Sequence, residues 1–523
     1  MYGGKNIMKK ILIMDTTLRD GEKVPGAKLN MNEQLKIAHQ LQKMKVDIIE
    51  TSFPSLSHNE LETTKMIAQK VGNKTTICVP SRAVRHDIDE VYNCVKNSYD
   101  PIIHIVLGSS DLYNGKNEEQ IFMQNIDAIK YAKSILPKVQ YSFTDASRQD
   151  FDELWNKIEL AVKAGADIIN IPDTVSFMVP DEYGEMISKI NYRLKNLNKN
   201  IILSVHCHND LGLATANSLV AIKNGADKIE CTINGIGERA GNTALEEVAM
   251  ILKLHKKYYN SYTNLAANEI SNTSKLVSYL MGIDIQVNKP ITGSNVFAHY
   301  SNLRMKEITD SKNAYEIIHP EDIGIENSEL VLTSRSGEAA LKKGLAKIGF
   351  DKFTAKELKN LFKNFLELAN KKKEIYSYDL LYLVEKNLEE NSIQGDEFLE
   401  FKNKLYELID IEVVSNILFS RATVKIKQKD SVFKGEGLGN GPVDAVYTAI
   451  RDVIKINIEL GEYKIKSVSK GKEALGKVAI QVIYSGKDYT AKAVDTDVVR
   501  ASAYAFVNAI NSIIIDEETS KNV

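Results

Sequence analysis

Two short polar runs contain the residue types that metal-assisted chemistry requires. One is Asp15-Thr-Thr-Leu-Arg-Asp-Gly-Glu22, which follows an apolar run, and the other is His206-Cys-His-Asn-Asp210. Side chains in a β-strand alternate between two faces, so His206 and His208 point the same way and Cys207 points away. Two imidazoles on one face form half of a divalent metal site, and Asp20 can add an oxygen ligand.

A glycine-rich loop, Asn234-Gly-Ile-Gly-Glu-Arg-Ala-Gly-Asn242, can bring a further polar side chain to this site. Such a mixed nitrogen and oxygen set suits Mg²⁺, Mn²⁺ or Zn²⁺ with open positions for a substrate. A His-x-His pair alone is more often packed or solvated than metal-bound. Its combination with the acidic turn favours the metal, and Cys207 is interpreted as a small buried residue rather than a nucleophile.

The elements that must position these residues follow a regular rhythm over the first 250 residues. Segments with helical periodicity, such as Asn32–Met44 and Asp150–Ala164, separate eight short β-rich runs. These runs are Ile11–Met14, Asp47–Ser52, Thr75–Val79, Ile102–Leu107, Val139–Phe143, Asp167–Ile171, Ile201–His206 and Lys228–Thr232. Strand–helix alternation predicts parallel pairing, and eight such units predict a closed (β/α)8 TIM barrel of the α/β class. An open doubly wound sheet is the alternative, but no Gly-x-Gly-x-x-Gly follows the first strand.

The pattern changes twice after the predicted barrel, which spans 1–265. Residues 266–408 predict a helical linker region, with helices expected at Ala355–Lys371, Tyr378–Asn387 and Asp396–Tyr406. Residues 409–523 predict a small α+β domain. Its expected elements are three strands, a glycine-rich turn and two helices, at Arg421–Lys427, Gly435–Gly441, Pro442–Lys455, Tyr463–Val468, Lys477–Tyr484 and Val498–Ser512.

Composition indicates an ordinary globular protein. Hydrophobic residues make up 43% and charged residues 26% of the 523 residues, and the formal net charge is -2, so nothing calls for nucleic acid or an anionic membrane as a partner. We expect no segment with the roughly 20 apolar residues that span a bilayer. The four cysteines lack Cys-x-x-Cys spacing, which argues against disulfides and favours the cytoplasm.

Over its full length the chain resembles the 2-isopropylmalate synthase family, whose barrels use a metal ion, an arginine and a His-x-His strand. The matching runs are the acidic run Asp15 to Glu22, Asn170-Ile-Pro-Asp-Thr-Val175, His206-Cys-His-Asn-Asp-Leu-Gly-Leu-Ala214 and Glu230-Cys-Thr-Ile-Asn-Gly-Ile-Gly-Glu-Arg-Ala-Gly-Asn242. The last two runs form a long and specific signature. The resemblance implies an acyltransferase that condenses acetyl-CoA with 2-oxoisovalerate and hydrolyses the thioester, at the start of leucine biosynthesis.

The same resemblance assigns roles at the site. It implies four metal ligands, namely Asp20, His206, His208 and Asn242. Arg19 would neutralise the alkoxide that forms on the former keto oxygen, Thr174 would anchor the substrate carboxylate, and His104 would lie near the substrate. The implied cofactor is Mg²⁺ or Mn²⁺, with Zn²⁺ and K⁺ as further candidates and acetyl-CoA as co-substrate.

The C-terminal runs Gly-Asn-Gly-Pro-Val-Asp-Ala445 and Asp495-Thr-Asp-Val-Val499 resemble the family's leucine-binding regulatory domain. The implied effector residues are Gly439, Gly441, Pro442, Asp444 and Asp497. The strand–helix halves of this domain suggest a two-fold assembly, so a homodimer is expected by analogy.

Two departures from the family pattern concern proton transfer. The family's Phe-Ala-His-x-Ser-Gly-Ile-His-Gln-Asp-Gly is Phe297-Ala-His-Tyr-Ser-Asn-Leu-Arg-Met-Lys-Glu307 here, so Arg304 stands where the catalytic histidine is usual. Arginine stays charged and cannot shuttle a proton. Thr144 replaces the carboxylate that the family places beside the active-site arginine. A later Lys-His-Ser-Gly-Arg run appears as Ser-Arg-Ser-Gly-Glu338 and loses another histidine.

Three interpretations remain open. The chain is a working isopropylmalate synthase in which Asp145, His299, His319 or water provides the acid/base function, with Asp145 and His299 as the chosen candidates. Alternatively it is a sibling synthase of the citramalate or homocitrate type that uses another 2-oxo acid. Or it is a catalytically impaired paralog that retains metal and oxo-acid binding and acts as a regulator or partner.

Overall fold

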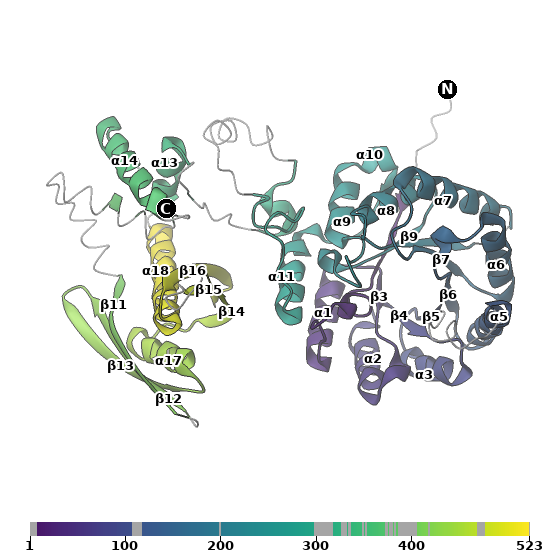
Figure 1. The fold of residues 1–523 in the computed structure, drawn as a ribbon, viewed down its shortest axis with the longest axis horizontal. Coiled ribbons are helices and arrows are strands. Elements are labelled where there is room, and N and C mark those ends of the chain that lie inside the picture. The colour runs from purple at the N-terminus through teal and green to yellow at the C-terminus, as the bar shows by residue number, and fades with distance from the viewer. Residues whose placement is uncertain are drawn as a thin grey trace. The chain divides into compact units, whose positions relative to one another are not determined.

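The fold is taken from a computed structural model (Figure 1). It describes residues 8–106, 118–197, 200–297, 317–325, 332, 336–347, 350, 353–371, 375, 380, 383–384, 405–416, 419–467 and 476–521. The chain divides into two compact units, Met1–Phe297 with Ile318–Ser328, and Ala298–Ile317 with Glu329–Val523. The first unit thus continues beyond residue 265. The three domain ranges given above remain a prediction.

The predicted barrel is confirmed. Eight parallel strands close in chain order into a barrel, and these are β2 (Leu12–Asp15), β3 (Ile48–Glu50), β4 (Thr76–Ser81), β5 (Ile102–Val106), β6 (Lys138–Ser142), β7 (Ile168–Asp173), β8 (Ile202–Cys207) and β9 (Lys228–Cys231). Hydrogen bonds between β2 and β9 close the ring, with Leu12 opposite Lys228. A short parallel pair, β1 (Lys9–Lys10) with β10 (Ser261–Tyr262), lies outside it.

Helices surround the strands in a ring (Figure 1). They are α1 (Met31–Lys43), α2 (His58–Val71), α3 (Arg85–Val95), α5 (Glu118–Ile135), α6 (Phe151–Ala164), α7 (Pro180–Lys195), α8 (Ala214–Lys223) and α9 (Leu245–Leu254), followed by α10 (Lys256–Tyr259) and α11 (Ile270–Met281). Sequence explains their ends. Asn30 forms a capping box with Glu33 at the start of α1, and Gly165 ends α6 in the left-handed conformation at φ 115°.

Side chains inside the barrel form layers, as strand alternation requires. The layer at the amino ends of the strands is mostly apolar and includes Met14, Ile48, Cys78, Ile102 and Ile168. The layer towards the carboxyl ends is polar, buried and hydrogen-bonded. It contains Glu50, His104, Ser142, Asn170 and His206. The apolar outer face of the strands packs against the helices, so the polar interior layer is the one available for chemistry.

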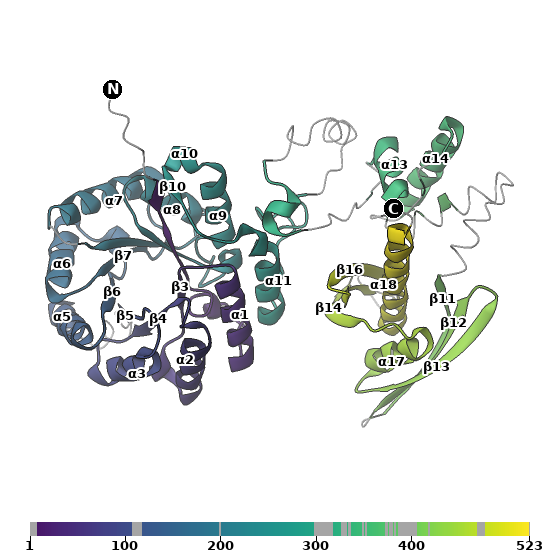
Figure 2. The same cartoon turned by 180° about the vertical axis from the view of Figure 1, so that it is seen from behind.

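The C-terminal part of the second unit contains two copies of a strand–strand–strand–helix unit. The first copy is β11 (Tyr406–Ser415), β12 (Ser420–Gln428), β13 (Ser431–Gly439) and α17 (Pro442–Ile454). The second is β14 (Glu459–Ser467), β15 (Gly476–Tyr484), β16 (Lys487–Asp495) and α18 (Val498–Lys521). Each helix packs on its own antiparallel sheet, as Figure 2 shows for α18. The rings of Tyr447 and Phe506 stack 4.2 Å apart and join the two copies.

Three details of the C-terminal prediction are wrong. Strands β11 and β16 were not expected, and Tyr406 begins a strand instead of ending a helix. The glycine-rich run is not a simple turn, since Gly435, Gly437 and Gly439 lie in β13. A Cβ at Gly437 would come within 2.4 Å of the backbone of α17, so these glycines allow the helix to approach the strand. The helix at Ala355–Lys371 is confirmed as α14, which packs against α13 (Glu338–Lys347).

Most of Tyr378–Asn387 and residues 396–404 lie outside the described residues, so the other two linker helices stay predictions.

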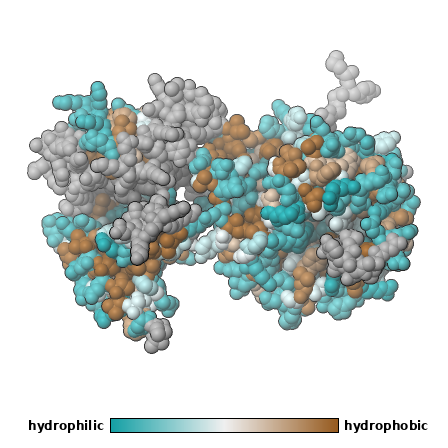
Figure 3. All heavy atoms as spheres, viewed as in Figure 1, coloured by the Kyte–Doolittle hydropathy of each residue, from teal (hydrophilic) through white to brown (hydrophobic). Residues whose placement is uncertain are grey.

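The expectation that no segment could span a membrane is corrected. By length and composition alone Val498–Glu517 in α18 could span a bilayer. However, Ala501, Ala505, Phe506 and Ile510 are buried in the core of their own unit, which accounts for the apolar composition of α18. On the face in Figure 3, hydrophobic residues of the barrel form small groups among hydrophilic ones.

Candidate active site

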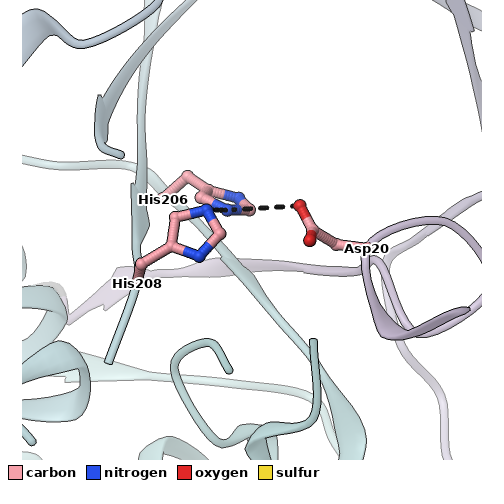
Figure 4. A group of neighbouring side chains, drawn as sticks. All are labelled: Asp20, His206 and His208. Carbon is pink, nitrogen blue, oxygen red and sulfur yellow. Dashed lines mark hydrogen bonds and ion pairs between the residues drawn. The ribbon is translucent and has the colours of Figure 1, made fainter. Parts of the chain in front are cut away.

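Asp20, His206 and His208 meet at the carboxyl ends of the barrel strands (Figure 4). Asp20 follows β2, and the two histidines come from the end of β8 and the residue just beyond it. Nε2 of His206 lies 3.6 Å from Oδ2 of Asp20 and 3.3 Å from Nε2 of His208. All three side chains are buried. The sequence prediction that these groups converge is therefore matched by their placement.

Buried polar atoms without a hydrogen-bond partner support a cation at this point. Oδ1 of Asp20, Nδ1 of His208 and Oδ1 of Asn242 are buried and have no hydrogen-bond partner among the described residues. A buried polar atom without a partner costs free energy. A divalent ion that these atoms coordinate as ligands would remove that cost. Two imidazoles, a carboxylate and an amide oxygen form a donor set that suits a divalent metal.

Asn242 reaches the cluster from the loop between β9 and α9. It pairs across a β-bridge with His208, and its Nδ2 donates to the carbonyl of Ile236 at 3.0 Å, which leaves Oδ1 free. Gly237 makes this possible because a Cβ there would lie 2.0 Å from Nδ2 of Asn242, and its φ is 154°. The loop prediction from glycine content thus agrees with the position of Asn242.

Electrostatics prepare Asp20 and His208 to bind a cation. Burial opposes ionisation of Asp20, but Arg19 and then His206 outweigh burial and hold the pKa of the Asp20 carboxyl well below its usual range. Burial, and then the neighbouring His206, lower the pKa of His208 to about 3. Asp20 is therefore ionised and His208 neutral near pH 7, which are the protonation states that metal ligands require.

Arg19 is fixed between two carboxylates. Its Nη1 lies 2.6 Å from Oδ2 of Asp20, and its Nε lies 2.7 Å from Oε2 of Glu50 on β3. Burial disfavours the charge on Arg19, but Glu50 and then Asp20 raise its pKa above the usual value. The guanidinium is thus permanently charged, oriented and adjacent to the candidate metal ligands.

Sequence reasoning missed Glu50. It expected the carboxylate beside the arginine at position 144, where this chain has threonine, whereas β3 supplies one instead. The available signal was a single acidic residue inside the otherwise apolar run that precedes Thr51. Glu50 also accepts Nδ1–H of His104 at 2.6 Å, and His104 Nε2 lies 2.7 Å from Oγ of Ser142. His104 and Arg19 therefore share the Glu50 carboxylate, one on each of its oxygens.

Thr174 and Asp145 lie at neighbouring strand ends. Oγ1 of Thr174 accepts the backbone N–H of Asp145 at 3.0 Å. The Asp145 carboxylate is paired with Arg148 of its own turn, with N–O distances of 2.5 to 2.9 Å. In this arrangement Asp145 is engaged in an ion pair of its own turn, and the structure does not bring its carboxylate into contact with Arg19.

One arginine connects three loops around the site. Arg239, in the loop after β9, binds both carboxylate oxygens of Asp210, in the loop after β8, at 2.9 and 3.0 Å. Its Nη2 also donates to the carbonyl of Thr174 after β7 at 2.6 Å. Nearby, Lys23 pairs with Glu238 at 2.9 Å and so links the loop after β2 to the loop after β9.

His299 and Arg304 lie outside the described residues. His319 begins a short helical turn, and its backbone N–H donates to Asp322 at 3.0 Å. The four cysteines are free and buried, and burial raises the pKa of Cys207 to about 12, which fits the expectation that it is not a nucleophile.

The predicted effector residues lie where the last strand of each copy of the C-terminal unit leads into its helix. Gly439 ends β13, Gly441 is the N-cap of α17, and Pro442 begins that helix. Oδ2 of Asp444 accepts the N–H of Asn440 at 2.9 Å. In the second copy, the Asp497 carboxylate accepts two backbone N–H groups at the start of α18.

The chain matches known protein families over most of its length. Residues 10–277 match the HMGL-like family, 291–373 the homocitrate synthase post-HMGL domain-like family, and 374–514 the LeuA allosteric (dimerisation) domain. A 2-isopropylmalate synthase from Geobacillus sp. (strain Y412MC10) is 48% identical over 97% of both chains. Proteins of the same name from Clostridium kluyveri and Dictyoglomus turgidum are 40% and 42% identical, over 97% of this chain and 97% and 99% of theirs.

Proposed function

Because this chain belongs to the 2-isopropylmalate synthase family, we propose that it condenses acetyl-CoA with 2-oxoisovalerate and hydrolyses the thioester to release 2-isopropylmalate and CoA. The observation that supports this most directly is the buried cluster of Asp20, His206 and His208 beside Arg19. This arrangement is suited to an anionic oxo acid. In this proposal the enzyme works in the cytoplasm, where it starts leucine biosynthesis.

The proposed metal ligands are Asp20, His206, His208 and Asn242, and Mg²⁺ or Mn²⁺ is preferred over Zn²⁺. When bound, the divalent ion would polarise the keto group of the oxo acid. Arg19 contributes a fixed positive charge where the keto oxygen becomes an alkoxide. A charge that meets developing negative charge stabilises the transition state more than the ground state.

Other residues bind and orient the substrate in this proposal. Oγ1 of Thr174 contacts the substrate carboxylate, and His104 is held beside Arg19 by Glu50 and Ser142. The hydrogen bond from His104 Nδ1–H to a carboxylate leaves Nε2 as the acceptor for the Ser142 hydroxyl. Removal of the proton from the acetyl methyl group is assigned to Asp145 or His299, with His319 and water as alternatives, since Arg304 cannot accept a proton.

A sibling synthase is the second candidate, and the substitutions at Thr144 and Arg304 are the observation that favours it. Pyruvate would make the product citramalate, and 2-oxoglutarate would make it homocitrate. A paralog with little condensing activity is the third. Discrimination between oxo acids depends on a few methylene groups, each worth about 1–3 kcal/mol, so the pocket must be tested with a panel.

The test is release of free thiol from acetyl-CoA with Mn²⁺ and a panel of 2-oxo acids. We expect the largest kcat/KM with 2-oxoisovalerate. Release with pyruvate alone would assign the chain as a citramalate synthase. Absence of release with every acid, together with calorimetric Mn²⁺ binding, would identify the impaired paralog. If Arg304→His raises turnover, the function of the family histidine is missing in this chain and no other residue has taken it over.

A further inference from the structure

Lys228 is a lysine with a fully buried side chain in the interior of the barrel. Its Nζ contacts three groups, which are Sδ of Met14 at 3.1 Å, Oε1 of Glu230 at 3.3 Å and Oε1 of Gln140. Burial of an ammonium group is costly unless the charge is paired. A site that required only volume would be filled at less cost by an apolar side chain, so the charge of Lys228 calls for a further explanation.

Glu230 connects this ammonium group to the candidate metal centre. Its Oε1 is close to Nζ of Lys228 and accepts hydrogen bonds from Gln140 Nε2 at 2.7 Å and from Ser204 Oγ at 3.3 Å. Its other oxygen, Oε2, lies 3.1 Å from Nδ1 of His206. The two carboxylate oxygens thus have different partners. Oε1 contacts Lys228, Gln140 and Ser204, and Oε2 contacts His206.

Strand register brings these groups together. On the parallel strands β8 and β9, Ser204 is opposite Lys228 and His206 is opposite Glu230. Because alternate residues of a strand share a face, all four side chains point into the barrel. Lys228 therefore lies one layer below Glu230, and Glu230 lies beside His206.

We propose that Lys228 is a positioning residue for the metal centre, which acts by holding Oε1 of Glu230 so that Oε2 receives Nδ1–H of His206. An imidazole that donates from Nδ1 keeps its lone pair on Nε2, and this is the atom that faces Asp20 and His208. Carboxylates behind metal-bound histidines orient the ring and its tautomer in this way. The proposal rests on the metal site of the proposed function but not on the identity of the oxo acid.

The test is Mn²⁺ affinity of the full chain, measured by titration calorimetry without substrate. Lys228→Met retains most of the volume and removes the charge, and we expect the affinity to fall about 10- to 100-fold. The matched control is Lys9→Met. Lys9 forms an ion pair at 2.6 Å with Asp227, the residue that precedes Lys228 in the sequence. Both side chains of this pair are partly exposed. Its loss should leave the affinity unchanged.

A double-mutant cycle separates positioning from simple support of the fold. If Lys228 acts through Glu230, then Lys228→Met combined with Glu230→Gln should weaken Mn²⁺ binding no more than Glu230→Gln alone. The visible spectrum of the Co²⁺-loaded protein should change in both single variants, because the ligand field at His206 changes. Fold losses that multiply in the double variant would overturn the proposal, as would wild-type Mn²⁺ affinity in Lys228→Met.

Lys228→Gln covers the case in which the methionine variant does not fold. It keeps a donor for Oε1 of Glu230 without a buried charge, so a smaller loss of Mn²⁺ affinity is expected. A loss in the folded variant larger than that of Glu230→Gln would contradict the proposal. Thiol release is not used in these measurements. A chain that binds Mn²⁺ but converts no oxo acid would refute the proposed function and still test Lys228.

Discussion

Single side chains at the mouth of the barrel differ in what controls their charge. Asp20 and His208 are both buried, yet the Asp20 carboxyl is kept ionised by Arg19, while His208 is kept neutral by burial and by His206. The result is an anion and a neutral imidazole side by side. Burial disfavours the charged form of both groups, and the positive charge of Arg19 is what keeps Asp20 ionised.

Loss of the Asp20 carboxylate should abolish metal binding. Asp20→Asn keeps the shape but removes the charged oxygen ligand, so we expect Mn²⁺ affinity to fall more than about 100-fold by calorimetry. Asp100→Asn is the control, because Asp100 pairs with Lys138 at the opposite end of the strands. Equal Mn²⁺ affinity in Asp20→Asn and wild type would show that the site is misplaced.

Asp15 makes stability depend on pH. Burial raises the pKa of the Asp15 carboxyl to about 7. In the unfolded chain it titrates near pH ~4, so between about pH 4 and 7 the folded state binds more protons and loses stability as pH rises, by up to about 4 kcal/mol.

Asp15→Asn should remove this decline. In urea unfolding, the variant should gain stability relative to wild type at pH 8 and gain less at pH 5, because the neutral side chain does not ionise. A pH dependence of the unfolding free energy identical in the two proteins would contradict the raised pKa of Asp15.

At residue scale, the sequence was sufficient to predict site residues whose side-chain types are typical of metal ligands. Asp20, His206 and His208 stand in short polar runs after strands, so their convergence followed from barrel topology. Glu50 and Lys228 could not be interpreted this way. Glu50 is the one charged residue of a short apolar strand, and Lys228 shares a four-residue strand with Glu230. Only the three-dimensional register reveals their partners.

At the scale of elements, the loop after β9 must fold so that Gly237 lies against Asn242 of the same loop. A Cβ at Gly237 would overlap the Asn242 amide, whereas one at Gly212, which also has positive φ, would meet nothing within 4 Å. Gly237→Ala should therefore displace Asn242 and weaken Mn²⁺ binding about tenfold, while Gly212→Ala should only strain its loop. Calorimetry of both variants tests this, and equal affinities would exclude Asn242 as a ligand held by the loop.

Strand–helix alternation was sufficient to predict the barrel, because each short apolar run is followed by a helix of regular periodicity. The C-terminal unit was harder. Strand β13 is rich in glycine, which usually indicates a turn, but here glycine serves close packing against α17. Strand β11 exposes Glu407, Asp410 and Glu412, and a register shift between Leu408 and Asp410 interrupts the alternation of its side chains. Local sequence does not reveal such tertiary requirements.

At the scale of the whole molecule, the match to a LeuA allosteric (dimerisation) domain supports a dimer. Light scattering after size-exclusion chromatography should give twice the chain mass of 58.5 kDa. A closed two-fold dimer should show no larger species as concentration rises. A mass of one chain at micromolar concentration would contradict this prediction.

Leucine should bind the C-terminal unit, lower the rate of thiol release and raise the melting temperature. Asp444→Ala should remove both effects, because Asp444 supports the turn at the start of α17. Asp452→Ala is the matched control on the same helix, where Asp452 forms an ion pair with Lys455 at 2.8 Å. Wild-type activity and melting temperature that do not respond to leucine would rule out the regulatory role.

The contacts of Arg239 have a mechanical consequence. A single guanidinium joins the segments that follow three consecutive strands, through Asp210 and the carbonyl of Thr174. Neither the segment after β7 nor the segment after β8 can move away from the segment after β9 without breaking a bond to Arg239. Arg239 thus acts as a brace for the rim on this side of the barrel, and salt that screens its partly exposed pair with Asp210 should loosen the brace.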